Sequence, residues 1–175
     1  MKSITLFFFL GTLVVTNSAL AERADRDKPV HLESDRATVE NTGRSNNKDR
    51  TSVFTGNVIL TQGTLIIRSD KMVVKEDEDG FKNAIAYGNL ASFRQKRDGK
   101  NEYVEGWSER MEYDSKADKV ELFKQARLRR GADEVHGEYI SYEATTEFFQ
   151  VNNGTKTNSE SRVRAVIQPK KKKQK

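Results

Sequence analysis

The sequence has 175 residues, of which 35% are hydrophobic and 33% charged, with a formal net charge of +5. The absence of cysteine excludes disulfides and thiolate metal sites, and the length predicts one domain. The positive charge lies at the C-terminus, because without Lys2 and the five lysines after Pro169 the chain has 25 basic and 26 acidic residues. A near-neutral body argues against a nucleic-acid-binding protein.

Residues 1–21 have the three parts of a secretory signal peptide. Lys2 gives a positive start, residues 4–15 are apolar apart from Thr and Gly, and residues 19–21 form a small-x-small cleavage site. The apolar run is short for a bilayer core of about 30 Å, which disfavours the alternative of an uncleaved membrane anchor. We therefore expect an exported protein that is cleaved after Ala21.

After the leader, hydrophobicity alternates with a period of two in short runs separated by Gly, Asn or Asp. This pattern is typical of many short β-strands. Residues 77–80, 98–101 and 114–118 indicate tight turns, since Asp, Asn and Gly tolerate a left-handed backbone. Residues 41–49 form a longer polar loop. The expected fold class is all-β.

A six-residue motif recurs at residues 34–39, 69–74, 108–113 and, less closely, 137–142. Each copy begins with a small residue and an acid, and each is followed by an element that ends in small or polar residues. Such a repeat predicts strand–corner–strand units that stack to bury their apolar faces. We interpret the acids at 35, 70 and 109 as corner residues whose carboxylates cap exposed backbone N–H groups where strands bend, rather than as catalytic groups.

The sequence resembles the LptA (OstA-like) family of periplasmic lipopolysaccharide-transport bridge proteins. The resemblance is carried by residues 29–35, by the continuous run 54–70 and by the recurring motif, and it extends over about residues 29–151. It implies a half-open, twisted antiparallel β-jellyroll, which we assign to residues 22–160. The lysine-rich C-terminus predicts a basic disordered tail at 161–175. The resemblance also implies an apolar groove that shields the acyl chains of lipopolysaccharide.

The alternation assigns one set of apolar side chains to the inner face of the fold. The inner positions expected to contact lipid are Val30, Leu32, Phe54, Val58, Leu60, Leu65, Ile67, Met72, Val74, Ala91, Phe93, Met111, Tyr113, Leu122, Leu128 and Ile140. From the residues alone this set is either a packed core or a groove for acyl chains, in which each buried methylene contributes about 0.8 kcal/mol. The resemblance favours the groove.

The sequence contains no recognisable catalytic arrangement. Its two histidines, His31 and His136, have no metal-pair spacing, and its glycines lie at turns rather than in a phosphate-binding loop. We therefore expect no enzymatic activity, no cofactor and no metal. Outward basic residues such as Arg68, Arg94 and Arg110 could bind the phosphates of a glycolipid. The alternative is that they are solvated surface charges without a ligand.

The unpaired edge strands of an open sheet indicate where partner proteins would bind. The first strand, around residues 29–33, and the last, around 148–152, carry few charges that would block pairing, so we expect head-to-tail strand addition. The resemblance implies lipopolysaccharide as cargo, an inner-membrane Lpt partner at the N-terminal edge and an outer-membrane translocon at the C-terminal edge. It further implies a head-to-tail homo-oligomer. The alternative function is a structural module that binds no lipid and only pairs its edges.

Overall fold

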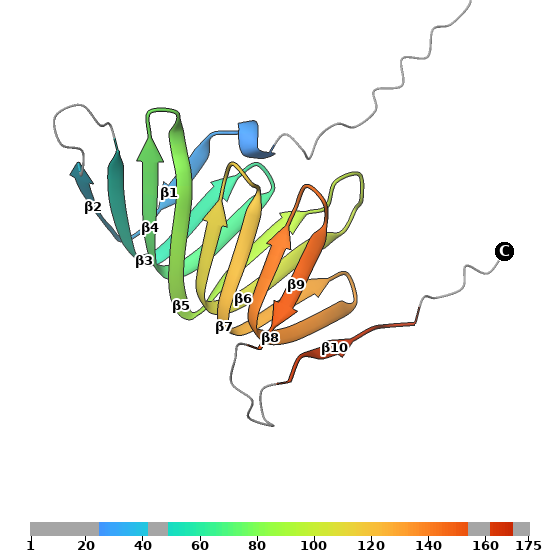
Figure 1. The fold of residues 1–175 in the computed structure, drawn as a ribbon. Coiled ribbons are helices and arrows are strands. Elements are labelled where there is room, and N and C mark those ends of the chain that lie inside the picture. Colours follow the sequence, from blue (N-terminus) through green and yellow to red (C-terminus); the bar gives the residue numbers. More distant parts are fainter. Residues whose placement is uncertain (1–24, 42–48, 154–161, 170–175) are drawn as a thin grey trace, which may run out of the picture.

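The computed structural model describes residues 25–41, 49–153 and 162–169, and these are nearly all antiparallel β-strand (Figure 1). The expected signal peptide, most of the polar loop at 41–49 and the lysines after Pro169 lie outside the described residues. The elements are η1 (Asp25–Asp27), β1 (Val30–Glu33), β2 (Arg36–Asn41), β3 (Arg50–Gln62), β4 (Leu65–Asp77), β5 (Gly80–Lys96), β6 (Tyr103–Asp114), β7 (Lys119–Arg130), β8 (Asp133–Glu143), β9 (Phe148–Asn152) and β10 (Arg164–Val166).

One sheet runs in the order β1-β3-β4-β5-β6-β7-β8-β10, with β2 also paired to β3 and β9 to β8. The register breaks midway along each adjoining pair of long strands, for example between Thr55 and Val58 and between Phe123 and Ala126. We call this line of breaks the corner. It divides the strands into a first half-sheet, which contains β1 and β10, and a second half-sheet, which contains β2 and β9. The result is the expected half-open antiparallel β-jellyroll of repeated modules.

The acids of the recurring motif lie at the corner, as predicted. Asp35, Asp70 and Glu109 each accept a hydrogen bond from an Asn or Gln of the following long strand, but only one of the donors is a backbone N–H. The contacts are Asn89 N–H to Asp70 Oδ2 (3.2 Å), Asn57 Nδ2 to Asp35 Oδ2 (3.1 Å) and Gln125 Nε2 to Glu109 Oε1 (2.7 Å). These contacts connect adjacent modules where the ladder is interrupted.

The fourth copy reverses the roles, because Asn153 Oδ1 accepts a hydrogen bond from the backbone N–H of Glu138 (3.1 Å).

The expected turns are present as well. Residues 77–80 join β4 to β5, with Gly80 at φ 104°, and residues 97–102 join β5 to β6, with Gly99 at φ 64°.

The strand β10 corrects the expectation of a disordered tail for residues 162–169, whereas the rest of the expected tail lies outside the described residues. Arg164 lies opposite His136 and Val166 opposite Glu134 in an antiparallel pair, and Asp133 Oδ1 accepts the backbone N–H of Gln168 (3.0 Å). Residues 162–165 alternate arginine with apolar residues, which is a strand pattern, and the apolar Val166 and Ile167 follow. The high basic content of the C-terminus concealed that alternation.

Candidate functional site: the apolar interior and its rim

All sixteen residues expected to contact lipid lie on the inner face. Thirteen of them are exposed by 3% or less, and Val30, Leu32 and Phe54 are partly buried and pack against the others. The predicted parity is therefore correct, whereas contact with lipid stays a prediction. Sequence reasoning missed the partly buried Phe149 and Val151 of β9. Their parity could have been found by continuing the alternation past the last turn.

The interior connects the two half-sheets along the whole molecule. The rings of Phe93, on the first half-sheet, and Tyr142, on the second, stack with centroids 6.2 Å apart. Gly106 lies opposite Phe93 in the register and leaves room for its ring. Burial raises the pKa of Tyr142 to about 12. The interior is thus a continuous apolar layer with very little accessible surface.

An apolar cavity of about 340 Å³ lies at the C-terminal end of this interior. Leu128 and Val135 line it from β7 and β8, Phe149 from β9, and Val163 and Ile167 from the C-terminal segment. Its volume is at the lower end of the range for small-molecule sites, about 300–1,000 Å³. The cavity can therefore take part of an acyl chain but not a whole glycolipid.

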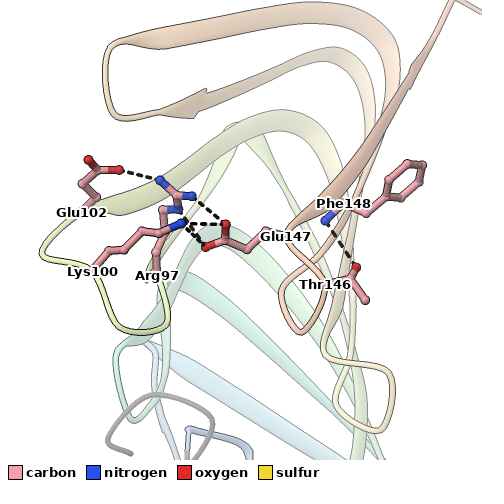
Figure 2. Close-up of polar contacts among 6 residues, drawn as sticks. All are labelled: Arg97, Lys100, Glu102, Thr146, Glu147 and Phe148. Atoms are coloured by element: carbon pink, nitrogen blue, oxygen red, sulfur yellow. Dashed lines mark hydrogen bonds and ion pairs between the residues drawn. The ribbon is translucent and has the colours of Figure 1, made fainter. Parts of the chain in front are cut away.

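Charged residues join the two half-sheets at the rim, which is formed by the turns between the long strands, away from the corner. Figure 2 shows these contacts. Arg97, just after β5 in the first half-sheet, donates from Nε and Nη2 to the two carboxylate oxygens of Glu147 (2.9 and 2.6 Å). Glu147 immediately precedes β9 in the second half-sheet. Lys100 Nζ lies 3.1 Å from the same carboxylate, and Glu102 accepts from Arg97 Nη1. We call these four residues the rim cluster.

The backbone at Glu147 is in the left-handed region, with φ 55°. A non-glycine residue held there costs on the order of 1 kcal/mol or more. The turn is supported by the Thr146 hydroxyl, which accepts the backbone N–H of Phe148 (3.3 Å, Figure 2). The turn thus presents the Glu147 carboxylate to Arg97 at some conformational cost.

The hydrogen bonds from Arg97, followed by those from Lys100, lower the pKa of Glu147 to about 2. The hydrogen bond to Glu147 in turn raises the pKa of Arg97. A carboxyl group with a lowered pKa in the folded state adds stability above its unfolded pKa, and that stability is lost as the pH falls through the folded pKa. For Glu147 the loss falls between about pH 5 and pH 2.

We therefore expect Glu147→Gln to lower the free energy of unfolding at pH 7 by about 1–2 kcal/mol. The difference from the unaltered protein should shrink as the pH falls below 5. Urea unfolding of both proteins at pH 7, 4 and 3 measures it. Glu78→Gln is the matched control, because Glu78 is exposed in a turn and has no ion pair among the described residues. An unchanged difference between pH 7 and pH 3 would contradict this assignment.

A second set of contacts joins the half-sheets at the N-terminal end of the rim. The Tyr113 hydroxyl, on the second half-sheet, donates to Gln62 Oε1 on the first (3.3 Å). Gln62 Nε2 donates to the carbonyl of Lys28, and Thr64 N–H donates to the buried Asp25 of η1 (2.9 Å). Burial raises the pKa of Tyr113. Polar contacts therefore close both ends of the rim over the apolar interior.

Catalytic or metal-binding arrangements are not evident in the ranges that the structure describes. No three His, Asp or Glu side chains among these residues come together as metal ligands. His31 is exposed on β1, and His136 Nε2 lies 2.7 Å from Glu134. Within the same ranges no helix is long and apolar enough to cross a membrane. What the arrangement offers is an apolar interior, a polar rim and two sheet ends.

Two half-sheets joined at a corner around an apolar interior define an open β-jellyroll of stacked modules. The family model described as "LptA/(LptD N-terminal domain) LPS transport protein" matches residues 31–148, and the chain belongs to this family.

Named relatives agree with this membership. The lipopolysaccharide export system protein LptA of Escherichia coli K12 is 34% identical over 142 residues, which are 80% of this chain and 73% of that protein. LptH of Pseudomonas aeruginosa is 27% identical over 99% of this chain and 98% of its own length. The crystal structure of LptH, described as the LptA-homologous periplasmic component of the lipopolysaccharide transport device, superposes with a TM-score of 0.73 at 23% identity. That superposition covers 83% of this chain and 99% of the LptH chain, and it supports the fold.

Proposed function

We propose that this protein binds lipopolysaccharide in the periplasm and carries it from the inner to the outer membrane as a non-catalytic part of the Lpt complex. Family membership and relatives named as lipopolysaccharide export proteins support this role. In the same proposal, residues 1–21 direct export and are removed. The observation that carries the proposal is the continuous apolar interior between the half-sheets.

Acyl chains must separate the half-sheets to enter, because the inner side chains are closely packed. The corner is continuous backbone, whereas the rim is joined by side-chain contacts, so the rim is the side that opens. Breaking the rim cluster costs about 1–3 kcal/mol. Ten buried methylenes contribute about 8 kcal/mol, which is enough to offset that cost and leave some energy for rearranging the packed interior.

Binding should therefore depend on acyl chains rather than on the sugar and phosphate groups. Purified protein titrated with lipopolysaccharide is expected to bind it at least about tenfold more tightly than the same molecule after deacylation. Isothermal calorimetry measures both affinities. Equal affinity for the two molecules would contradict an apolar binding site.

The alternative is an assembly module whose interior is a dry core. The near-complete burial of the inner side chains favours it, and it makes a different prediction. An assembly module would still form edge-paired oligomers but would not bind lipopolysaccharide at all. The calorimetric titration therefore distinguishes the two functions.

In the proposed bridge, β1 and β2 form the end that meets the inner-membrane partner or a preceding copy. The other end, at β9 and β10, meets the next copy or the outer-membrane translocon. Each of these four strands pairs on one side only among the described strands. An unpaired strand edge can take up a strand of another chain. Head-to-tail addition would make the interiors of successive copies continuous.

The C-terminal end can be tested by truncation. A chain that ends at Asn153 retains β9 and is expected to form concentration-dependent oligomers, as the full chain does. A chain that ends at Glu147 lacks β9 and is expected to remain monomeric, because the edge that receives the next copy is gone. Light scattering over a range of concentrations measures both, with circular dichroism as the check on folding. Oligomers of the shorter chain would contradict this assignment of the edge.

A further inference from the structure

A second cavity, of about 370 Å³, lies on the outer face of the first half-sheet near the corner, apart from the apolar interior. Arg127, His136, Arg162 and Arg164 line it. We propose that this cavity binds an anion that carries a phosphate group.

Three adjacent strands bring the basic side chains together. Arg127 of β7 lies opposite His136 of β8, and His136 lies opposite Arg164 of β10. Arg162 is two residues before Arg164 and also lines the cavity. Because side chains directly across neighbouring strands lie on one face of a sheet, the register itself builds this cluster. The sequence alone does not indicate it, since residues 127 and 164 are far apart in the chain.

The positive charge of the cavity is largely unneutralised. Among the described residues, no carboxylate forms an ion pair with Arg127, Arg162 or Arg164. By contrast, Arg129, two residues along β7, donates from Nε to Glu105 (2.9 Å). Of the nearby acids, Glu134 is engaged by His136, and Glu138 lines the cavity.

Three guanidinium groups therefore face one carboxylate. Like charges in one place repel, so a bound anion would lower the electrostatic energy of the cluster.

Arg127 is positioned in advance for such a ligand. Its guanidinium carbon lies 4.0 Å from the centre of the Trp107 ring, in cation–π contact. Its Nε atom is inaccessible to solvent and has no hydrogen-bond partner. Stacking fixes the plane of the guanidinium fork, and a planar fork matches the oxygens of a phosphate group in a bidentate geometry.

The cavity is larger than a single phosphate needs, so the ligand is either free phosphate or a phosphorylated sugar such as a glycolipid head group. In both cases the bound anion would link the C-terminal segment to β7 and β8, because Arg162 and Arg164 belong to that segment. The inference does not rest on the binding of acyl chains in the interior.

Nuclear magnetic resonance titration of the ¹⁵N-labelled protein tests the site, with inorganic phosphate and deacylated lipopolysaccharide as separate probes. We expect saturable shifts of the amides of His136 and Arg164. Arg127→Gln should weaken binding by about tenfold. Arg129→Gln, which removes the same charge from the same face outside the cavity, should leave the affinity within about twofold.

Tighter binding of the deacylated glycolipid than of phosphate would identify a head group as the ligand, and equal binding would identify the phosphate group itself. The proposal is overturned if no saturable shift occurs up to about 10 mM of either probe, since the Kd would then lie above about 10 mM. It is also overturned if the two arginine variants lose affinity equally.

Discussion

Gly106→Val is expected to lower the free energy of unfolding by about 3 kcal/mol, through overpacking of the interior. Gly106 lies on the inner face of β6, opposite Phe93 of β5 and Leu128 of β7. A Cβ atom at this position would lie 2.2 Å from Cε1 of Phe93 and 2.9 Å from Cδ1 of Leu122. The rigid Phe93 ring is itself packed against Tyr142. The added side chain must therefore displace packed atoms.

A double-mutant cycle tests this explanation. Phe93→Ala alone should cost about 3–5 kcal/mol, because it leaves a cavity. In the combined variant the valine would occupy part of that cavity, so the total loss should be smaller than the sum of the single losses by about 1 kcal/mol or more. Urea unfolding of the four proteins measures it. Additive losses would show that Gly106 and Phe93 do not share the same space.

Joining the rim covalently is expected to abolish lipopolysaccharide binding. Because the chain has no cysteine, Arg97→Cys and Glu147→Cys can be linked specifically by a short bifunctional thiol reagent. The unlinked variant should still bind, since loss of the rim cluster leaves the apolar interior intact. The linked variant should bind at least about tenfold more weakly, because acyl chains enter only when the half-sheets separate.

The matched control links two strands within one half-sheet. Lys71 of β4 and Tyr87 of β5 are directly opposite in the register, and both are exposed. Cysteines linked at these positions leave the rim free, so binding should be unchanged. If the linked rim variant binds lipopolysaccharide as tightly as the unlinked one, acyl chains do not enter through the rim.

The fold and the residues of the inner face could be predicted because both depend on local sequence patterns. The small–acid pair marks the corner, where the inward parity changes, as from Ile67 to Met72 on β4. On β3 the parity is kept, because two residues, Gly56 and Asn57, are inserted between Thr55 and Val58. Alternation on either side of the corner then fixes which side chains face inward.

The rim cluster and the outer basic cavity could not be predicted in this way. Arg97 and Glu147 lie fifty residues apart in polar turns, and in the sequence they do not differ from solvated surface charges. Arg127 and Arg164 meet only because β10 returns to pair with β8. Both sites depend on contacts between modules, whereas the sequence pattern describes each module by itself.

Photocrosslinking from two adjacent phenylalanines tests the proposed binding of lipopolysaccharide most directly. Phe149 is partly buried and lines the apolar cavity at the end of the interior, whereas its neighbour Phe148 is 62% exposed. A photoreactive phenylalanine analogue changes the side chain similarly at either position. The two variants therefore differ mainly in whether the analogue faces the interior or the solvent. In living cells, lipopolysaccharide should be recovered from position 149 and not from 148. Recovery from 148 alone, or from neither position of a folded and exported protein, would contradict an interior that carries acyl chains.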